Sequence, residues 1–218
     1  MKRLFTLKPL YLAIIGLIGI ACFVFWLLSV MLPITLIELR YQYTHTLAQA
    51  FGITDIRGLI LPTFTVDLKG TMSKNTTNGI TIPSLFIDEP IIFNVDPNDS
   101  TQYLEALKHG IAHASGTAFP DSGKMGYYFA HSSTPTFVKQ FNAVFYLLHK
   151  LNINDEIYIF HDGKRYEYTV YAKQIVDPND TAFLRYQNTV ETIVLQTCWP
   201  PGTTSERLLV FAKRIAKP

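Results

Sequence analysis

The sequence predicts a mainly β domain, a barrel or sandwich with short helices, preceded by one N-terminal transmembrane helix. Two observations support this prediction. An uncharged apolar run occupies residues 9–37, and short β-rich runs alternate with turn signals over residues 80–215. At 218 residues, the chain has room for one such domain and a short appendage.

The composition excludes two classes of protein. Hydrophobic residues make up 48% of the chain and charged residues only 17%, so intrinsic disorder is excluded. The formal net charge is +2, and no basic stripe is interleaved with aromatic residues. We therefore expect no nucleic-acid partner.

The apolar run at residues 9–37 is long enough to span a bilayer, whose core of about 30 Å needs roughly 20 apolar helical residues. Basic residues precede the run, at Lys2, Arg3 and Lys8. The positive-inside bias then keeps the N-terminus in the cytoplasm and exports the chain after residue 38. The alternative is a cleaved signal peptide, but the run is longer than the usual 7–15 residues and lacks a small-x-small site.

These features divide the chain into four expected parts, which are a cytoplasmic N-terminus (1–8), a transmembrane anchor in contact with membrane lipid (9–37), an extracellular stalk or linker (38–79) and a folded domain (80–218). The stretch 34–51 lacks glycine and predicts a helical extension of the anchor. The cluster Asn75-Thr76-Thr77-Asn78-Gly79 predicts the loop that enters the domain.

The domain itself contains runs typical of short strands. The expected strands are 80–82, 85–87, 91–95, 127–130, 156–161, 164–173, 192–197 and 207–212. Asp162-Gly163 predicts a hairpin, while Pro83 and Pro90 predict edge or bulged strands. Helical spacing is found at 102–109 and 136–151, and residues 176–190 form a long connection.

Cys198 is the strongest candidate for chemistry. It is the one cysteine in the exported part, because Cys22 lies within the membrane run, and it therefore has no intramolecular disulfide partner. It also sits where a strand runs into a turn, a position that exposes a side chain while the strand fixes it. The residues alone leave two readings open, a reactive thiol or a buried structural one.

A thiol with a pKa near about 8.5 needs a base or a cation to become a nucleophile. His131 follows the expected strand 127–130 and is the best-placed histidine. Arg207 begins the strand after Cys198 and approaches the thiol if the two strands pair, although an arginine at a strand start is also often solvated. His45, His149 and His161 have the settings of surface histidines.

His109 and His113 form an HxxxH pair, which on a continuous helix suggests a metal site. Gly110 lies between them and no third ligand is near, so we expect no metal here and no cofactor elsewhere.

Several segments resemble sortases, in the order in which that family carries them. Val194-Leu195-Gln196-Thr197-Cys198 resembles the TLxTC signature, and Tyr128-Phe129-Ala130-His131-Ser132 resembles the strand of the catalytic histidine. The segments 110–118, 82–83, 155–157 and 199–210 extend the resemblance over about residues 80–215. Val194 replaces the usual first Thr, and Ala130 replaces a common Gly. The loop Trp199-Pro200-Pro201-Gly202-Thr203 resembles class D or E enzymes.

The resemblance implies an eight-stranded sortase-like β-barrel and a cysteine transpeptidase. Cys198 would attack a sorting signal of the LPxTG kind, His131 would be the acid and base, and Arg207 would stabilise the oxyanion or position the peptide. Thr197 and Ala130 would contact the substrate. The implied partners are sorting signals of exported proteins and an amine nucleophile of the cell wall or another protein, at the outer face of the cell membrane.

Two rival functions stay open. In a membrane-tethered cysteine peptidase, water instead of an amine would resolve the same acyl-enzyme. In a non-catalytic peptide-binding β-barrel, Cys198 would be dispensable.

Overall fold

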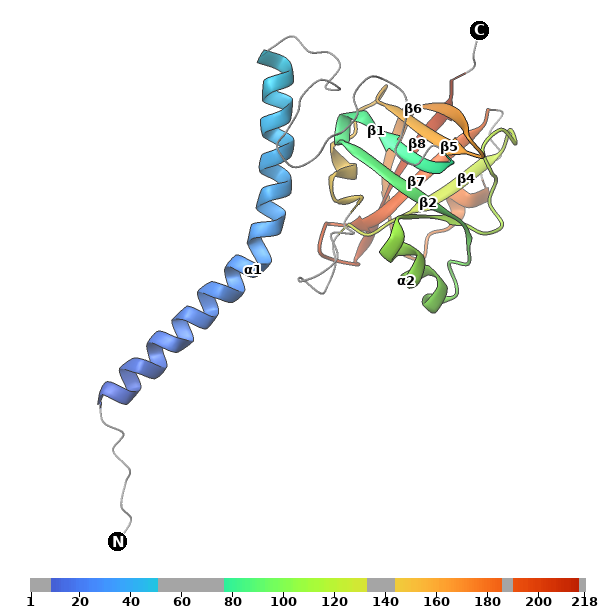
Figure 1. Ribbon diagram of the computed structural model, residues 1–218. Coiled ribbons are helices and arrows are strands. Elements are labelled where there is room, and N and C mark those ends of the chain that lie inside the picture. Colours follow the sequence, from blue (N-terminus) through green and yellow to red (C-terminus); the bar gives the residue numbers. More distant parts are fainter. Residues whose placement is uncertain (1–8, 51–76, 133–143, 186–189, 216–218) are drawn as a thin grey trace. The chain divides into compact units, whose positions relative to one another are not determined.

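The computed structural model describes four stretches of the chain, residues 9–50, 77–132, 144–185 and 190–215 (Figure 1). The chain divides into two compact units, Met1–Leu47 and Ala48–Pro218, which are described separately below. Most of the predicted linker and its entry loop lie outside the described residues.

The first unit is dominated by helix α1 (Pro9–Ala50), which has 42 residues. Within it, Tyr11–Ser29 has a mean hydropathy of 2.6, and none of this 19-residue window is buried by the protein. By length and composition this window can cross a membrane. The helix continues to Ala50 through the stretch for which the sequence predicts a helical extension.

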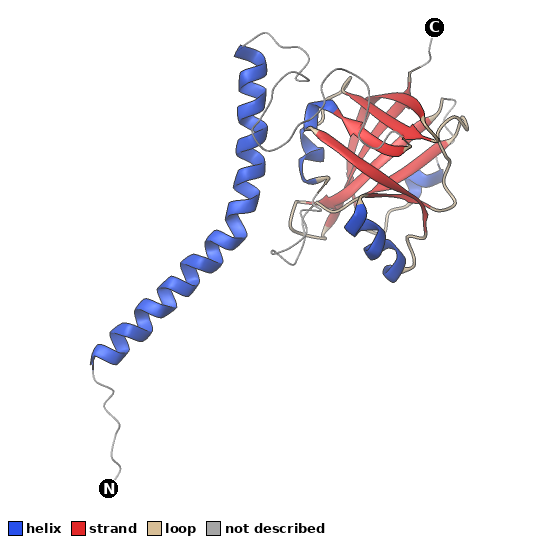
Figure 2. Ribbon diagram, viewed as in Figure 1, coloured by secondary structure: helices blue, strands red, loops and turns tan. Residues whose placement is uncertain are grey.

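The second unit is a closed barrel of eight strands with a few short helices at its periphery (Figure 2). The strands are β1 (Asn78–Ile82), β2 (Ile87–Val95), β3 (Ile111–Ala114), β4 (Met125–Phe129), β5 (Glu156–His161), β6 (Lys164–Val176), β7 (Thr192–Trp199) and β8 (Glu206–Arg214). The helical elements are η2 (Pro83–Leu85), α2 (Ser100–His109), η3 (Tyr146–Lys150) and η4 (Ala182–Arg185). The predicted mainly β class and eight-stranded barrel are confirmed.

Around the barrel the strands follow the order β1-β2-β3-β4-β7-β8-β6-β5, and β1 pairs with β5 to close it. Two of the pairings, β2 with β3 and β4 with β7, are parallel, and the other six are antiparallel. The parallel pairing of β4 with β7 matters for function, because parallel strands end at the same edge of a sheet.

The sequence missed β3 and misjudged the region around Pro90. Strand β3 has four residues, all buried, so it lacks the polar alternation that predicts a strand. Pro90 lies inside β2, opposite Gly79 of β1, so the strands expected at 85–87 and 91–95 are joined in one strand. The pairing with β3 begins at Ile91, and its register shifts between Ile92 and Val95, as expected for a bulged strand. A Cβ on Gly110 would come within 2.3 Å of the Pro90 carbonyl oxygen, so glycine permits the chain to enter β3 here.

The helix predicted at 136–151 is described only in part. Its C-terminal residues form the 3-10 helix η3, and residues 136–143 lie outside the described part of the chain. The predicted connection 176–190 begins later than expected, because β6 continues to Val176, and it contains η4. The hairpin at Asp162-Gly163 is confirmed, with His161 opposite Lys164.

Strands β7 and β8 form a long and largely buried part of the barrel wall. Their central residues are buried on both faces of the sheet. On the outer face, Phe183 of η4 contacts the rings of Tyr127 and Phe211. Exposure increases toward the end of β7 and at both ends of β8, and at the Cys198 end of this pair Gln196, Cys198 and Arg207 are partly accessible.

A buried carboxylate ties the strands together at the opposite end of β7. Glu191 is 9% exposed, and its carboxylate accepts hydrogen bonds from the Tyr168 hydroxyl at 2.5 Å and from the Gly123 amide at 2.9 Å. An unpaired buried acceptor costs free energy because it has lost its contact with water. This end of the barrel therefore depends on its hydrogen-bond donors.

Replacing Tyr168 by phenylalanine is expected to lower the free energy of unfolding by about 1–3 kcal/mol, because Glu191 loses a hydrogen-bond donor. Urea denaturation of the full chain in detergent micelles measures the change. Tyr158→Phe is the matched control, since the Tyr158 hydroxyl bonds to Glu156 on the exposed surface, and it should change stability by less than about 0.5 kcal/mol. Equal losses in both variants would contradict the role of Glu191.

Candidate active site

Cys198 is the next-to-last residue of β7 and has a free thiol that is partly accessible. The long pairing of β7 with β8 fixes its backbone. Because residues alternate between the two faces of a strand, Cys198 shares the outer face with Gln196. The thiol is thereby held at the rim of the barrel.

Arg207 lies directly across from Cys198 in the register of β7 and β8. Directly opposed residues place their side chains on the same face of a sheet, with Cβ atoms about 4.5–5.5 Å apart. The Arg207 Nη1 donates to the carbonyl oxygens of Thr204 and Glu206 at 2.9 and 3.0 Å. These bonds hold the guanidinium at the start of β8, in the register position opposite Cys198, and both come from the same nitrogen.

His131 follows β4 by two residues and exits the sheet at the same edge as Cys198. The Ala130 amide donates to the Gln196 carbonyl at 3.2 Å, which extends the contact with β7 to the residue next to His131. The His131 carbonyl accepts from the Phe145 amide at 3.1 Å. The parallel pairing of β4 with β7 therefore brings His131 close to a cysteine that is 67 positions away in sequence.

The sequence predicts that Thr197 and Ala130 contact the substrate, but their side chains do not lie on the accessible face. Both are buried, and the Thr197 hydroxyl donates to the Ala130 carbonyl at 2.9 Å. The bond joins β7 to the segment that carries His131, and it removes the hydroxyl from the accessible face. We therefore propose that this pair positions His131 relative to Cys198 instead of contacting the substrate through side chains.

Burial sets the protonation of two side chains at this edge. It lowers the pKa of His131 from its ordinary value of 6.5, so the imidazole is mainly neutral at pH 7 and able to accept a proton. It raises the pKa of Tyr127 far above 10, an effect that Cys198 adds to and the positive charge of Arg207 opposes. The Tyr127 phenol therefore stays protonated and can donate a hydrogen bond at any physiological pH.

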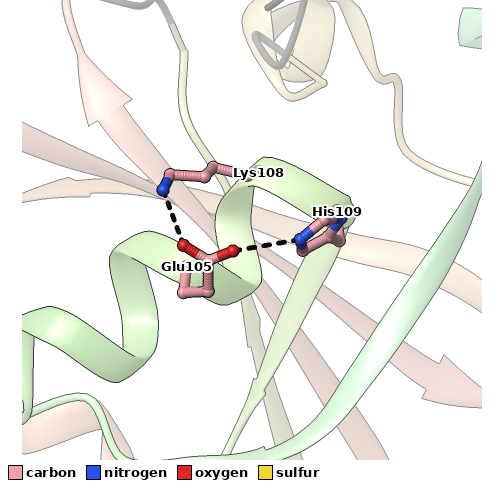
Figure 3. A network of polar contacts seen from close by, with 3 residues as sticks. All are labelled: Glu105, Lys108 and His109. Carbon is pink, nitrogen blue, oxygen red and sulfur yellow. Dashed lines mark hydrogen bonds and ion pairs between the residues drawn. The ribbon is translucent and has the colours of Figure 1, made fainter.

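The HxxxH pair is divided between two environments. His109 lies on the surface of α2, where its ring and Lys108 both contact the Glu105 carboxylate (Figure 3). His113 is fully buried in β3, and its Nε2 lies 3.1 Å from the Ala118 carbonyl oxygen. Within the described stretches, no cluster of three or more histidine, cysteine, aspartate or glutamate side chains suits a metal ion.

The buried His113 leads to a prediction about acid stability. Burial lowers its pKa from 6.5, aided by His161 and opposed by the hydrogen bond to Ala118. Below about pH 6.5, this histidine binds a proton more readily in the unfolded chain than in the folded chain. The free energy of unfolding therefore has its full value above this pH and decreases as the pH falls. Thermal unfolding between pH 8 and 5 should show this decline.

The variant His113→Asn should show a shallower decline with falling pH. The decline should not vanish, because the pKa of His131 is lowered in the same direction. Identical pH profiles for this variant and the wild type would contradict the assignment.

Sequence reasoning missed three residues of this site, namely Tyr127, Phe183 and Gln196. The Tyr127 hydroxyl donates to Gln196 Oε1, and Phe183 covers Tyr127. One signal was available, because Gln196 is a polar residue in an otherwise apolar strand and lies two positions before Cys198 on the same face. The position of Phe183 was not predictable, because it depends on the path of the connection from β6 to β7.

Comparison with known proteins places the chain in a family. Residues 80–215 match the family model described as the sortase domain. Sortase D of Bacillus subtilis (strain 168) is 24% identical over 137 residues, which cover 62% of this chain and 61% of that protein. The match thus extends over less than two thirds of that relative's length.

Solved structures agree with the family model. A lid mutant of sortase A from Corynebacterium diphtheriae is 30% identical with a TM-score of 0.55, covering 66% of this chain and 72% of that one. Sortase C-1 from Actinomyces oris is 27% identical with a TM-score of 0.54, covering 64% and 73%. Since the family model matches more than half of the chain and the barrel has the same fold, this protein belongs to the sortase family.

Proposed function

We propose that this protein is a membrane-anchored cysteine transpeptidase that cleaves a sorting signal and transfers its acyl part to an amine. The observation that best supports this is the pairing of Cys198 with Arg207 beside the exit of His131. A nucleophile, a cation and an acid–base group then meet at one edge of the barrel, as nucleophilic acyl transfer requires. Sortases, as a family, are cysteine transpeptidases that act on sorting signals.

The first half-reaction forms a thioester. Neutral His131 accepts the thiol proton, and Cys198 Sγ attacks the threonine carbonyl carbon of an LPxTG-like signal. Arg207 donates hydrogen bonds to the oxyanion that develops on that carbonyl oxygen, or to the adjacent peptide. When the C–N bond breaks, the leaving nitrogen takes the proton from the His131 imidazolium, and the acyl group stays on sulfur.

The second half-reaction releases the enzyme. An incoming amine attacks the thioester carbonyl, and His131 accepts the proton that the amine loses. Collapse of the tetrahedral intermediate breaks the C–S bond, and the Cys198 thiolate recovers that proton. The net change is one peptide bond broken and one formed, so neither an oxidant nor an external energy source is needed.

The apolar window in α1 fits this proposal. We infer that it anchors the protein with its N-terminus in the cytoplasm and the barrel outside, as the basic residues before it favour. An anchored enzyme meets substrates that are themselves held at the membrane by hydrophobic segments. Confinement of both partners raises their effective concentration without any new contact.

The test uses the full chain in detergent micelles and a library of LPxTG-like peptides, with and without oligoglycine. Intact-protein mass spectrometry detects the acyl-enzyme, and chromatography detects the products. We expect an adduct on Cys198 and a ligated product only when amine is present. Hydrolysis alone would favour the peptidase alternative, and a folded protein that forms no adduct with any peptide would contradict the proposal.

Replacing Arg207 by alanine is expected to lower kcat/KM by about 10²–10³-fold, because the oxyanion loses its donor. Arg207→Lys should recover only part of the loss, since an ammonium cannot reproduce the planar fork of the guanidinium. Steady-state kinetics with the best library peptide measure both variants. Arg165→Ala, on the distant β5–β6 hairpin, is the control and should retain full activity. An Arg207→Ala variant with wild-type kcat/KM would remove Arg207 from the mechanism.

A further inference from the structure

Gln196 is a polar side chain in a part of the sheet that is otherwise apolar. It follows three buried residues of β7, Ile193, Val194 and Leu195, and is itself partly exposed. It lies on the same face as Cys198, two residues earlier. A side chain at this position therefore lies on the face along which the acyl part of a substrate attached to Cys198 would extend.

The orientation of the Gln196 amide is fixed by Tyr127. The Tyr127 hydroxyl donates to Gln196 Oε1, and Tyr127 itself is only 8% exposed. This hydrogen bond turns the oxygen of the amide toward Tyr127. The amide nitrogen then faces away from it, and within the described part of the chain Gln196 Nε2 makes no hydrogen bond.

From this geometry we propose that Gln196 is a substrate-positioning residue, a role that rests on the proposed function. Its Nε2 donates a hydrogen bond to a main-chain carbonyl of the bound sorting signal. Tyr127 is a positioning residue that acts through Gln196 by holding the amide.

The spacing of residues along β7 indicates which main-chain carbonyl of the peptide accepts this hydrogen bond. Two residues along β7 span about 6.6 Å, which is also the span of two residues in an extended peptide. Carbonyls two residues apart in an extended peptide point to the same side. For a peptide that runs parallel to β7, which the proposal includes, the acceptor is the carbonyl two residues before the one that Cys198 attacks. This is the proline carbonyl of an LPxTG-like signal.

The experiment is a double-mutant cycle between enzyme and peptide. Thioamide peptides, each with one carbonyl oxygen replaced by sulfur, weaken one acceptor at a time. Wild type, Gln196→Leu and Tyr127→Phe, as full chains in micelles, are compared by kcat and KM for acylation. Gln174→Leu makes the same substitution at an exposed position of β6 and is the matched control.

We expect Gln196→Leu to raise KM roughly 3- to 10-fold with little change in kcat, because the bond forms equally in the ground and transition states. Tyr127→Phe should give a smaller rise in KM, and Gln174→Leu none. The thioamide at the proline carbonyl should weaken binding to the wild type but not to Gln196→Leu. The proposal is overturned if this thioamide weakens binding equally in the wild type and in Gln196→Leu, or if Gln196→Leu leaves KM unchanged.

A binding measurement separates this proposal from the proposed function. Fluorescence anisotropy of an LPxTG-like peptide with alanine at the variable position is measured on Cys198→Ala and on Cys198→Ala/Gln196→Leu. These proteins carry out no acylation, so the comparison is independent of turnover. Weaker binding by the double variant supports the role of Gln196, and equal binding contradicts it, whether or not the wild type forms an acyl-enzyme.

Discussion

Replacing Cys198 by alanine is expected to abolish acyl-enzyme formation, with a loss of at least about 10³-fold in turnover, because no other group supplies the nucleophile. The variant should fold normally. Cys198 is only partly buried, and losing one sulfur from the rim creates no enclosed cavity. Mass spectrometry of the full chain, after incubation with the peptide library, measures the adduct directly.

The second cysteine provides the matched control. Cys22 is exposed on the surface of α1, within the apolar window, so Cys22→Ala should keep full acylation and turnover. An adduct that persists in Cys198→Ala and disappears in Cys22→Ala would reverse the assignment. Turnover that persists in both single variants would exclude a cysteine nucleophile altogether.

The second large effect is expected for His131→Ala, which should lower kcat/KM by about 10²–10⁴-fold. The imidazole accepts the thiol proton, and it returns a proton to the leaving amine, so its removal slows both events. Because burial lowers the pKa of His131, the wild-type enzyme holds it mainly neutral at pH 7, ready to accept that proton.

His113→Asn tests whether the loss is specific to His131. The His113 ring is fully buried and bonded within the barrel, so this variant should lower the melting temperature while the folded fraction keeps turnover within a few-fold of the wild type. Circular dichroism reports the folded fraction in parallel with the kinetics. A folded but inactive His113→Asn, beside an active His131→Ala, would refute the choice of histidine.

The sequence left the pairing of the cysteine and arginine strands as a condition, although both strands lie in one short stretch joined by a proline- and glycine-containing turn. The structure shows that they form an antiparallel pair, with Cys198 opposite Arg207. The hairpin at Asp162-Gly163 was predictable, because local turn chemistry determines it. Their roles in catalysis stay predictions.

The face on which each residue of β7 lies was not predictable from the sequence. A strand with one solvated face alternates between polar and apolar residues, but β7 is buried on both faces over most of its length. Because the sequence of β7 shows no such alternation, Thr197 was predicted to contact the substrate. In the structure its side chain is buried and donates a hydrogen bond to the Ala130 carbonyl. The same loss of pattern concealed β3.

The closeness of His131 to Cys198 required information that lies far from both residues. It depends on β4 pairing in parallel with β7, although β5, β6 and the three connections between these strands separate them in sequence. Its position after the expected strand 127–130 made His131 the best-placed of several histidines, and the resemblance to sortases strengthened that choice. Long-range pairing of this kind follows from the topology of the whole barrel and not from any local pattern.

The order of β7 and β8 in the sequence has a consequence for the synthesis of the protein. Cys198 lies in β7, and Arg207 lies in β8, which follows β7 in the sequence and pairs with it. A nascent chain that has β7 but not yet β8 therefore carries the thiol without the arginine opposite it. If the proposed roles hold, such a chain should acquire its activity only after β8 has joined the sheet.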